Sequence, residues 1–280
     1  MAAQPDWLRQ VPTDKQLPAD AVVVHTGCGT SFHAAQTGGW AVQALEAVLR
    51  APRADIMVCV SHEGGTPLTM EAERAFGGDV WLVTGNPDSE FAQLVDEVIV
   101  AAPEIERSWC HTASYTSAVA VIAALHGDDI SGLPDAVERA LQQTVEPFEE
   151  SRVLFVGAGR DWPTAQEAAL KLREGAWVDA TAYDTETILH GHLAAVDGSV
   201  RAYVLEGEGR AAERAADAVA ALETLGCRVD LVPTEHPVVD IVRFQLLTLA
   251  VAEARGIDPD PIRRTPGSPW AEAGGEAYPY

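Results

Sequence analysis

TGCGTSFHAAQ, at residues 26–36, ends an apolar run and opens a segment with helical periodicity. A second stretch, VGAGRDWPTAQ at residues 156–166, shares its Gly-x-Gly, an aromatic residue three positions after the second glycine, and the final Ala-Gln. The offset between the two is 130 residues throughout. Strand-to-helix turns can share Gly-x-Gly by chance, but the aromatic residue and the Ala-Gln in register favour an internal duplication.

The segments around these turns alternate between strands and helices. Apolar runs at 21–27, 56–60, 79–85 and 97–102 are typical of parallel strands that are buried on both faces. Helical patterns cover 35–50, 67–76 and 114–125, an amphipathic connecting helix is expected at 133–150, and the pattern restarts at 152. The prediction is an α/β protein of two tandem domains, residues 1–148 and 149–280, each a flavodoxin-like three-layer sandwich with a parallel sheet flanked by helices.

Composition excludes several classes of function. The formal net charge is −23 and no basic stripe interrupts it, which argues against nucleic acid as a partner. No apolar stretch approaches the roughly 20 residues of a membrane span, and the start lacks a secretory pattern, so we expect a cytoplasmic protein without a membrane partner. The four cysteines stand far apart and are expected to be small buried residues. Only two of the 19 cations are lysines, Lys15 and Lys171, so a lysine is an informative residue here.

A dinucleotide-binding fold is the obvious alternative for a Gly-x-Gly turn after a strand. The third glycine of that fingerprint is replaced by Phe32 in the first turn and by Trp162 in the second. No acidic residue closes the second strand, where a ribose would be bound. We therefore set this alternative aside.

Four segments resemble the double sugar-isomerase (SIS) domain proteins, and most closely the isomerase half of glucosamine-6-phosphate synthase. They are VVVHTGCGTSFHAAQ, VSHEGGTPLT, ERSWCHTASYT and AQEAALKLREGAWVDATAYDTETILHGHLAAVDG, in the order and at the spacing of that family. No glutaminase half and no N-terminal cysteine nucleophile is present in this sequence, so a glutamine-dependent amidotransferase is not expected from this polypeptide alone.

The resemblance implies that two hydroxyl-rich loops of the first domain hold a sugar phosphate. One loop is Gly29, Thr30 and Ser31. The other is SHEGGT at 61–66, in which Ser61, Gly64 and Thr66 match the pattern and Glu63 replaces a serine. Hydroxyls and turn N–H groups can surround phosphate oxygens without adding charge.

Glu63 raises the question of what the loop binds. An ionised carboxylate about 4 Å from a phosphate costs on the order of 4 kcal/mol at an effective dielectric of about 20, roughly a thousandfold in affinity. Three alternatives follow: Glu63 points away, Glu63 is protonated and donates a hydrogen bond, or the ligand presents a hydroxyl or ammonium group instead. A loop glutamate that simply faces solvent is the ordinary case.

Glu167, Lys171 and Glu174 are spaced by four and three residues and share one face of a helix. Such a pattern usually marks a solvated salt-bridge face. The scarcity of lysine and the resemblance favour an active site instead, with Glu174 moving a proton between C1 and C2 of an open-chain sugar. Lys171 is expected to orient Glu174 or to stabilise the enediolate charge.

His190 aligns with the family's ring-opening histidine, which the resemblance implies reaches into the site of a neighbouring subunit of a homodimer. His-x-His at 190–192 is also a pattern of metal ligands, but the sequence places no third ligand, so neither a metal nor an organic cofactor is expected. A histidine that merely caps or packs at a turn is the remaining alternative.

The C-terminal segment GIDPDPIRRTPGSPWAEAGG begins like the family's tail but departs from it. The family's tail carries a lysine that forms a Schiff base with the sugar, whereas this segment offers Arg263 and Arg264. Arginine stays protonated and does not form that imine under ordinary conditions, which makes lysine-dependent amination chemistry doubtful.

Three functions are consistent with these residues. The first is an isomerase, deaminase or deglycase acting on a small amino sugar or ketosamine that is phosphorylated. The second is a sugar-binding module without catalysis, favoured by the tail and by Glu63. The third is an enzyme on an unphosphorylated, cationic amino sugar that pairs with Glu63.

Overall fold

The computed structural model describes residues 1–276 and is made of two compact units. The first joins Met1–Arg139 to the C-terminal segment that begins at Arg263, and the second is Ala140–Ile262. The boundary expected from the sequence, after residue 148, falls between α6 (Leu133–Ala140) and β6 (Arg152–Gly157).

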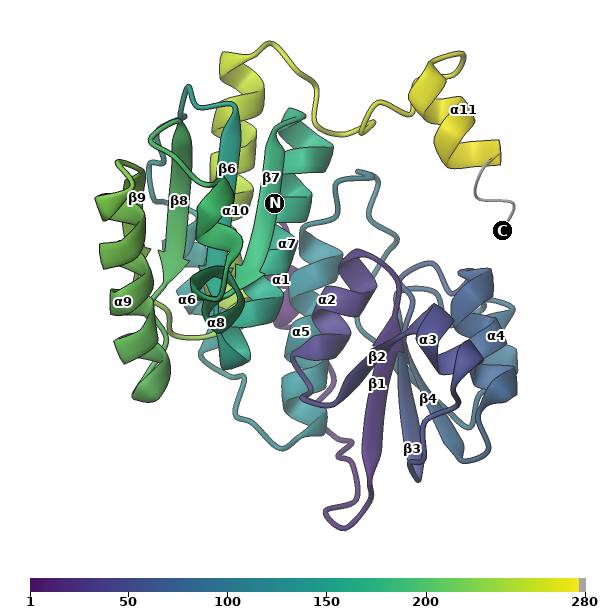
Figure 1. Ribbon diagram of the computed structural model, residues 1–280. Coiled ribbons are helices and arrows are strands. Elements are labelled where there is room, and N and C mark those ends of the chain that lie inside the picture. Colours follow the sequence, from purple (N-terminus) through teal and green to yellow (C-terminus); the bar gives the residue numbers. More distant parts are fainter. Residues whose placement is uncertain (277–280) are drawn as a thin grey trace. The chain divides into compact units, whose positions relative to one another are not determined.

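The first unit is built on a parallel sheet with the strand order β2-β1-β3-β4-β5, which is the flavodoxin-like order (Figure 1). Its strands are β1 (Val23–Gly27), β2 (Ala41–Gln43), β3 (Ile56–Val60), β4 (Asp79–Thr84) and β5 (Glu97–Val100). Its helices are α1 (Gln4–Leu8), α2 (Thr30–Gln36), α3 (Ala44–Leu49), α4 (Pro67–Ala75), η1 (Phe91–Gln93), α5 (Ala113–Leu125), α6 and α11 (Pro269–Glu276).

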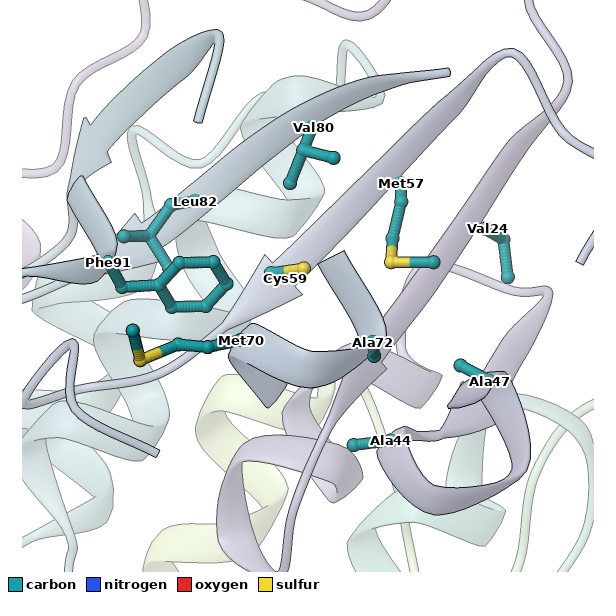
Figure 2. Packing of buried hydrophobic residues seen from close by; sticks show 10 residues of the cluster. All are labelled: Val24, Ala44, Ala47, Met57, Cys59, Met70, Ala72, Val80, Leu82 and Phe91. Atoms are coloured by element: carbon teal, nitrogen blue, oxygen red, sulfur yellow. The ribbon is translucent and has the colours of Figure 1, made fainter. Parts of the chain in front are cut away.

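Helices cover both faces of this sheet. On one face, α3 and α4 pack on the strands through Ala44, Ala47 and Met70, with Met57 and Cys59 of β3 beneath them (Figure 2). On the other face lie α2 and α5 (Figure 1). Every residue of β3 is buried, which is why its sequence is an unbroken apolar run.

The second unit repeats this arrangement with four strands in the order β7-β6-β8-β9. After β6, its strands are β7 (Asp179–Asp184), β8 (Val200–Leu205) and β9 (Arg228–Val232). Its helices are η2 (Gly159–Asp161), α7 (Trp162–Ala176), α8 (Thr185–Leu189), η3 (His192–Ala195), α9 (Arg210–Thr224) and α10 (Pro237–Ala254). This order matches the first four strands of the first sheet, so the α/β fold class of two similar domains is confirmed.

The two glycine turns have the same geometry. A Cβ on Gly27 would lie 2.8 Å from the backbone of Ser31, and one on Gly157 would lie 2.8 Å from the backbone of Asp161. The second glycine has φ +53° in the first turn and φ +58° in the second, a conformation that favours glycine. The Gly-x-Gly repeat thus reflects the same tight turn from strand into helix.

The single helix expected at 35–50 is wrong. Helix α2 ends at Gln36, and Gly39 has φ +98°. Gly38 passes so close to the ring of His25 that a Cβ would overlap it. The chain then extends, and residues 41–43 pair in parallel with β1 before α3 begins. Pairing with the sheet edge overrides the helical periodicity.

The connecting helix expected at 133–150 is shorter in the structure. It is helical only over Leu133–Ala140. Thr144 and Val145 are β-branched, and Pro147 has no N–H and restricts the residue before it. These residues explain why the helix does not continue to 150.

No helix among residues 1–276 combines the length and the apolar character that crossing a membrane requires.

Candidate functional site

The second hydroxyl loop connects β3 to α4 and has a defined shape. Ser61 is buried, and its Oγ lies 3.0 Å from Oγ1 of Thr66. Gly64 has φ +66°, and a Cβ there would overlap Ser89. The three matching residues of the motif therefore fix the conformation of the loop itself.

A pocket lies beside the first hydroxyl loop, at the carboxyl edge of the first sheet. Its volume is about 40 Å³, room for about three water molecules. Thr30 and Ser31 of the loop at 29–31 line it. Polar residues with no role assigned from the sequence line it as well: His62, Thr84, His111, Ser114 and Tyr115.

Glu63 does not line this pocket. Its side chain is exposed, and its backbone carbonyl accepts a hydrogen bond from Nδ2 of Asn86 at 3.1 Å. This placement favours the first of the three alternatives, in which the carboxylate points away from the ligand.

A different carboxylate, Glu106, lies behind the pocket and is only 10% exposed. It accepts hydrogen bonds from the backbone N–H groups of Thr112, Ala113 and Ser114 at 2.9–3.1 Å, at the start of α5. The hydroxyls of Thr112 and Ser114 also donate to it, at 2.8 and 2.6 Å. Burial alone would raise the pKa of Glu106, but the nearby His111 and the hydrogen bonds from Ser114 and Thr112 hold that pKa well below its usual range. Glu106 is therefore a fixed negative charge.

Two histidines that line the pocket, His62 and His111, lie next to Glu106. Nε2 of His62 accepts the backbone N–H of Glu106 at 2.9 Å, and Nδ1 of His111 lies 3.2 Å from Oγ of Ser114. The ring centroids are 5.6 Å apart in an edge-to-face arrangement. Burial lowers the pKa of His62 to about 4, and the nearby His111 adds to this effect, while Glu106 opposes it.

In the second unit, the structure brings Lys171 and Glu174 together on α7. Nζ of Lys171 lies 2.7 Å from Oε2 of Glu174 and 3.3 Å from Oε1 of Glu167. Lys171 is 1% exposed and Glu167 is fully buried, whereas Glu174 is 23% exposed. The face that the spacing predicted is thus largely buried, with Glu174 as its accessible member.

His190 lies just after α8 and is 75% exposed. Its Nε2 is 2.6 Å from Oε1 of Glu186, which also pairs with Arg214. Its role in ring opening stays a prediction. Among residues 1–276, no three His, Cys, Asp or Glu side chains are grouped as a metal ion would require.

The C-terminal arginines of the first unit stack on indole rings. The guanidinium of Arg264 lies 4.7 Å from the ring of Trp109, and that of Arg263 lies 4.2 Å from the ring of Trp270. Trp109 belongs to the same loop as Glu106 and His111, so the tail contacts the segment that carries the pocket.

Comparison with known proteins relates most of the chain to proteins named as phosphosugar enzymes. No family model matches the sequence. A glutamine–fructose-6-phosphate aminotransferase (isomerizing) from Gloeobacter violaceus is 25% identical over 301 residues, which cover 84% of this chain and 49% of that protein. The chain spans about half the length of the curated relatives that it matches.

Solved structures show the same architecture. The C-terminal domain of the glucosamine-fructose-6-phosphate aminotransferase from Francisella tularensis superimposes with a TM-score of 0.77 at 18% identity, over 92% of this chain and 96% of that one. A glucosamine-6-phosphate deaminase from Thermotoga maritima gives a TM-score of 0.74 at 20% identity, over 93% of each chain. The fold is the double SIS fold. The resemblance found in the sequence is thereby confirmed at the level of the fold and over most of the chain.

The residues missed from the sequence of this double SIS protein are those around Glu106. The segment ERSWCHTASYT was matched to the family as a motif, but its polar residues received no role. Three of them, Glu106, His111 and Ser114, meet at the start of α5. Their spacing of five and three residues across a loop has no regular period, so only the folded structure shows that they are in contact.

Proposed function

We propose that this protein is a sugar isomerase or deaminase of the SIS type that acts on a phosphorylated amino sugar or ketosamine by proton transfer between C1 and C2. The observation that carries the proposal is the contact between Lys171 and Glu174, which fixes the orientation of the partly exposed carboxylate of Glu174. The relatives and the matching structures are enzymes whose names specify phosphorylated hexoses and hexosamines, which supports the substrate class.

Glu174 is the acid–base group of this mechanism. As a carboxylate it removes the proton from C2 of the open-chain aldose, which leaves an enediolate with its negative charge on O1. It then returns the proton to C1 while the proton of the C2 hydroxyl passes to O1, which gives the ketose. Lys171 is buried against both glutamates, so its part is to orient Glu174. No metal is needed to move this proton.

The test is hydrogen exchange in deuterated water, at C1 of fructose 6-phosphate, whose C2 is the carbonyl carbon, and at C2 of glucosamine 6-phosphate. We expect exchange with the native protein and a loss of about 10²–10⁴-fold in Glu174→Gln. Glu213→Gln is the matched control, because Glu213 is an exposed helical glutamate paired with Arg210 and should leave exchange unchanged. Exchange that survives in Glu174→Gln removes that residue from its role.

We also propose that the active protein is a cytoplasmic homodimer. A residue that completes the site of a neighbouring copy must be exposed, and the side chain of His190 is exposed. Mixing inactive Glu174→Gln with inactive His190→Ala should restore part of the exchange, because mixed dimers would contain one intact site. Absence of any restored exchange, with mixed dimers verified by mass, would speak against this arrangement.

A second candidate is a sugar-binding protein without catalysis. It is favoured by the tail, which carries Arg263 and Arg264 where the family has an imine-forming lysine. Stabilisation by the same two sugar phosphates in a thermal-shift experiment, without hydrogen exchange at C1 or C2, is the outcome that this candidate requires. The third alternative, in which Glu63 pairs with a cationic sugar, loses support because Glu63 is exposed and does not line the pocket.

A further inference from the structure

We propose that the second unit carries a binding site of its own for a free α-amino acid with an apolar side chain, in which Asp240 binds the ammonium group and Arg243 binds the carboxylate. Neither Lys171 nor Glu174 lines this site. The inference therefore does not depend on the reaction proposed above.

The site is a cavity at the carboxyl end of β9, where α10 begins. Its volume is about 420 Å³, which is within the range of small-molecule sites. Ligands of open parallel α/β sheets bind at this end of the strands. The polar side chains that line the cavity include Gln143, Asp240 and Arg243.

Asp240 is a buried carboxyl group at this cavity, with 8% of its surface exposed. Its Oδ1 accepts the backbone N–H of Glu235 at 3.0 Å. Its Oδ2 is buried and has no hydrogen-bond partner among residues 1–276, which is unusual for a buried polar atom. Because the terminal torsion of a carboxyl group is broad, a small rotation would let Oδ2 accept a hydrogen bond from a donor in the cavity.

The charges around Asp240 favour an ammonium group as that donor. Burial raises the pKa of Asp240 to about 7; Asp161 and Glu235 add to this effect, and the backbone N–H groups of Glu235 and His236 oppose it. No ion pair of Asp161, Glu235 or Asp240 is found in the part of the chain that the structure describes. A bound ammonium group would supply the missing positive charge.

Arg243 provides the opposite charge on the same cavity. It follows Asp240 by three residues on α10, and opposite charges at this spacing can pair. Neither an ion pair between the two nor a hydrogen bond of the Arg243 guanidinium is found among the described residues. The guanidinium is a fork of donors that suits a carboxylate. Two neighbouring, unpaired, opposite charges match a ligand that carries an ammonium group and a carboxylate on one carbon.

The preference for an apolar side chain follows from the rest of the wall. Ala140, Val232, Pro233 and Val239 also line the cavity. Burial of an aliphatic side chain against them is favourable, whereas an acidic side chain would be repelled by the nearby carboxyl groups. L-leucine is therefore the first probe.

The first experiment is calorimetric titration of the native protein with L-leucine, for which we expect saturable binding. Two analogues each lack one charge: the corresponding 2-hydroxy acid has no ammonium group, and L-leucinamide has no carboxylate. Each should bind at least about tenfold more weakly, the usual loss when a charge-assisted hydrogen bond is removed. Absence of saturable binding of L-leucine, or equal binding of either analogue, overturns the proposal.

The second experiment tests the two side chains. Asp240→Asn and Arg243→Gln should each weaken binding of L-leucine at least about tenfold. Asparagine at position 240 keeps an acceptor for the N–H of Glu235, so the fold should be retained, and thermal unfolding without ligand checks this. Glu223→Gln and Arg228→Gln, at exposed positions of the same unit, are the matched controls and should keep the native affinity. Native affinity in Asp240→Asn or in Arg243→Gln rejects the assignment.

A third measurement separates this site from the proposed reaction. Glu174→Gln should bind L-leucine with the native affinity, because Glu174 does not line the cavity. If the native protein binds L-leucine but exchanges no hydrogen of either sugar phosphate, the proposed function fails and the amino-acid site stands. Hydrogen exchange without any binding of L-leucine rejects the site alone.

Discussion

Lys171 is one of only two lysines in the chain, and it is held inside the second unit with almost no exposure. A buried ammonium is stable only when paired, and here two carboxylates, Glu167 and Glu174, face it. Because Glu167 is also fully buried, removing the lysine would take the paired cation away from a carboxylate that water does not reach. The residue that orients the proposed base is therefore also important for stability.

Lys171→Met should lower the free energy of unfolding by about 3–5 kcal/mol, the usual cost of an uncompensated buried charge. Changing Glu167 to Gln in the same protein should recover part of this loss, because the buried side chain at position 167 is then neutral. Urea denaturation followed by circular dichroism measures both variants.

Lys15→Met is the matched control for this prediction. Lys15 pairs with Glu97, but its side chain is 40% exposed. Exposed pairs contribute about 0–1 kcal/mol, so the loss should be small. Equal losses at the two lysines would contradict the argument from burial.

Two buried histidines of the first unit make stability depend on pH. Burial lowers the pKa of His25 to about 4 from 6.5, the neighbouring His126 lowers it further, and the backbone of Trp40 opposes the shift. His62 is lowered to about 4 as well. Between about pH 6.5 and pH 4 the unfolded chain binds protons that the folded chain does not, so stability falls as the pH falls through this window.

We expect His25 and His62 to lower the unfolding free energy as the pH falls from 7 to 4.5, whereas Asp240, whose pKa burial raises to about 7, acts in the opposite direction over the same range. His62→Gln should reduce the slope, since one of the two groups is removed. Urea titrations at several pH values provide the measurement. An unchanged slope in His62→Gln would falsify the assignment of His62 as a neutral buried group.

At the scale of elements, the turn from strand to helix is the unit that both halves of the chain share. In each half the first glycine allows the strand and the following helix to approach closely, and the second takes a positive φ. The helix that follows begins beside the carboxyl edge of the sheet. This turn places Thr30 and Ser31 at the pocket in the first unit.

Gly27→Ala and Gly157→Ala should each destabilise the protein by about 1–3 kcal/mol, since the added methyl group lies against backbone that cannot move easily. Gly132→Ala is the control, because a Cβ at Gly132 meets no atom within 4 Å. Thermal unfolding of the three variants gives the comparison. A loss at only one of the two repeat glycines would indicate that the turns are not equivalent in energy.

The sequence was informative where structure depends on short-range pattern. The buried strands follow from unbroken apolar runs, the paired turns from glycines, and the shared helix face of Lys171 and Glu174 from a spacing of three. Contacts without a regular spacing could not be predicted. Examples are the close approach of Gly38 to the ring of His25 before β2, and the hydrogen bonds of Glu106 with the start of α5. The orientation of Glu63 was equally open, since a loop residue has no period.

At the scale of the whole molecule, the net charge of −23 opposes the compact state. Salt weakens this repulsion by shortening the screening length from about 30 Å at about 10 mM to about 8 Å at about 150 mM. The charge therefore links stability to ionic strength even though no single pair of residues is responsible.

Raising the sodium chloride concentration from about 10 mM to about 150 mM at pH 7 should raise the Tm, by about 2–4 °C for each kcal/mol of repulsion removed. Differential scanning calorimetry measures the shift. The same experiment at an acidic pH where the net charge is close to zero should show little change, and a shift of equal size there would point to specific ion binding.

The burial of Lys171 also makes its rate of acylation a measure of local opening in the second unit. Reagents that acylate amines can reach Lys15 in the native protein, whereas Lys171 becomes available only when α7 opens. The delay between the two modifications, measured by mass spectrometry, thus reports how often α7 opens locally. A bound sugar that stabilises α7 would lengthen this delay.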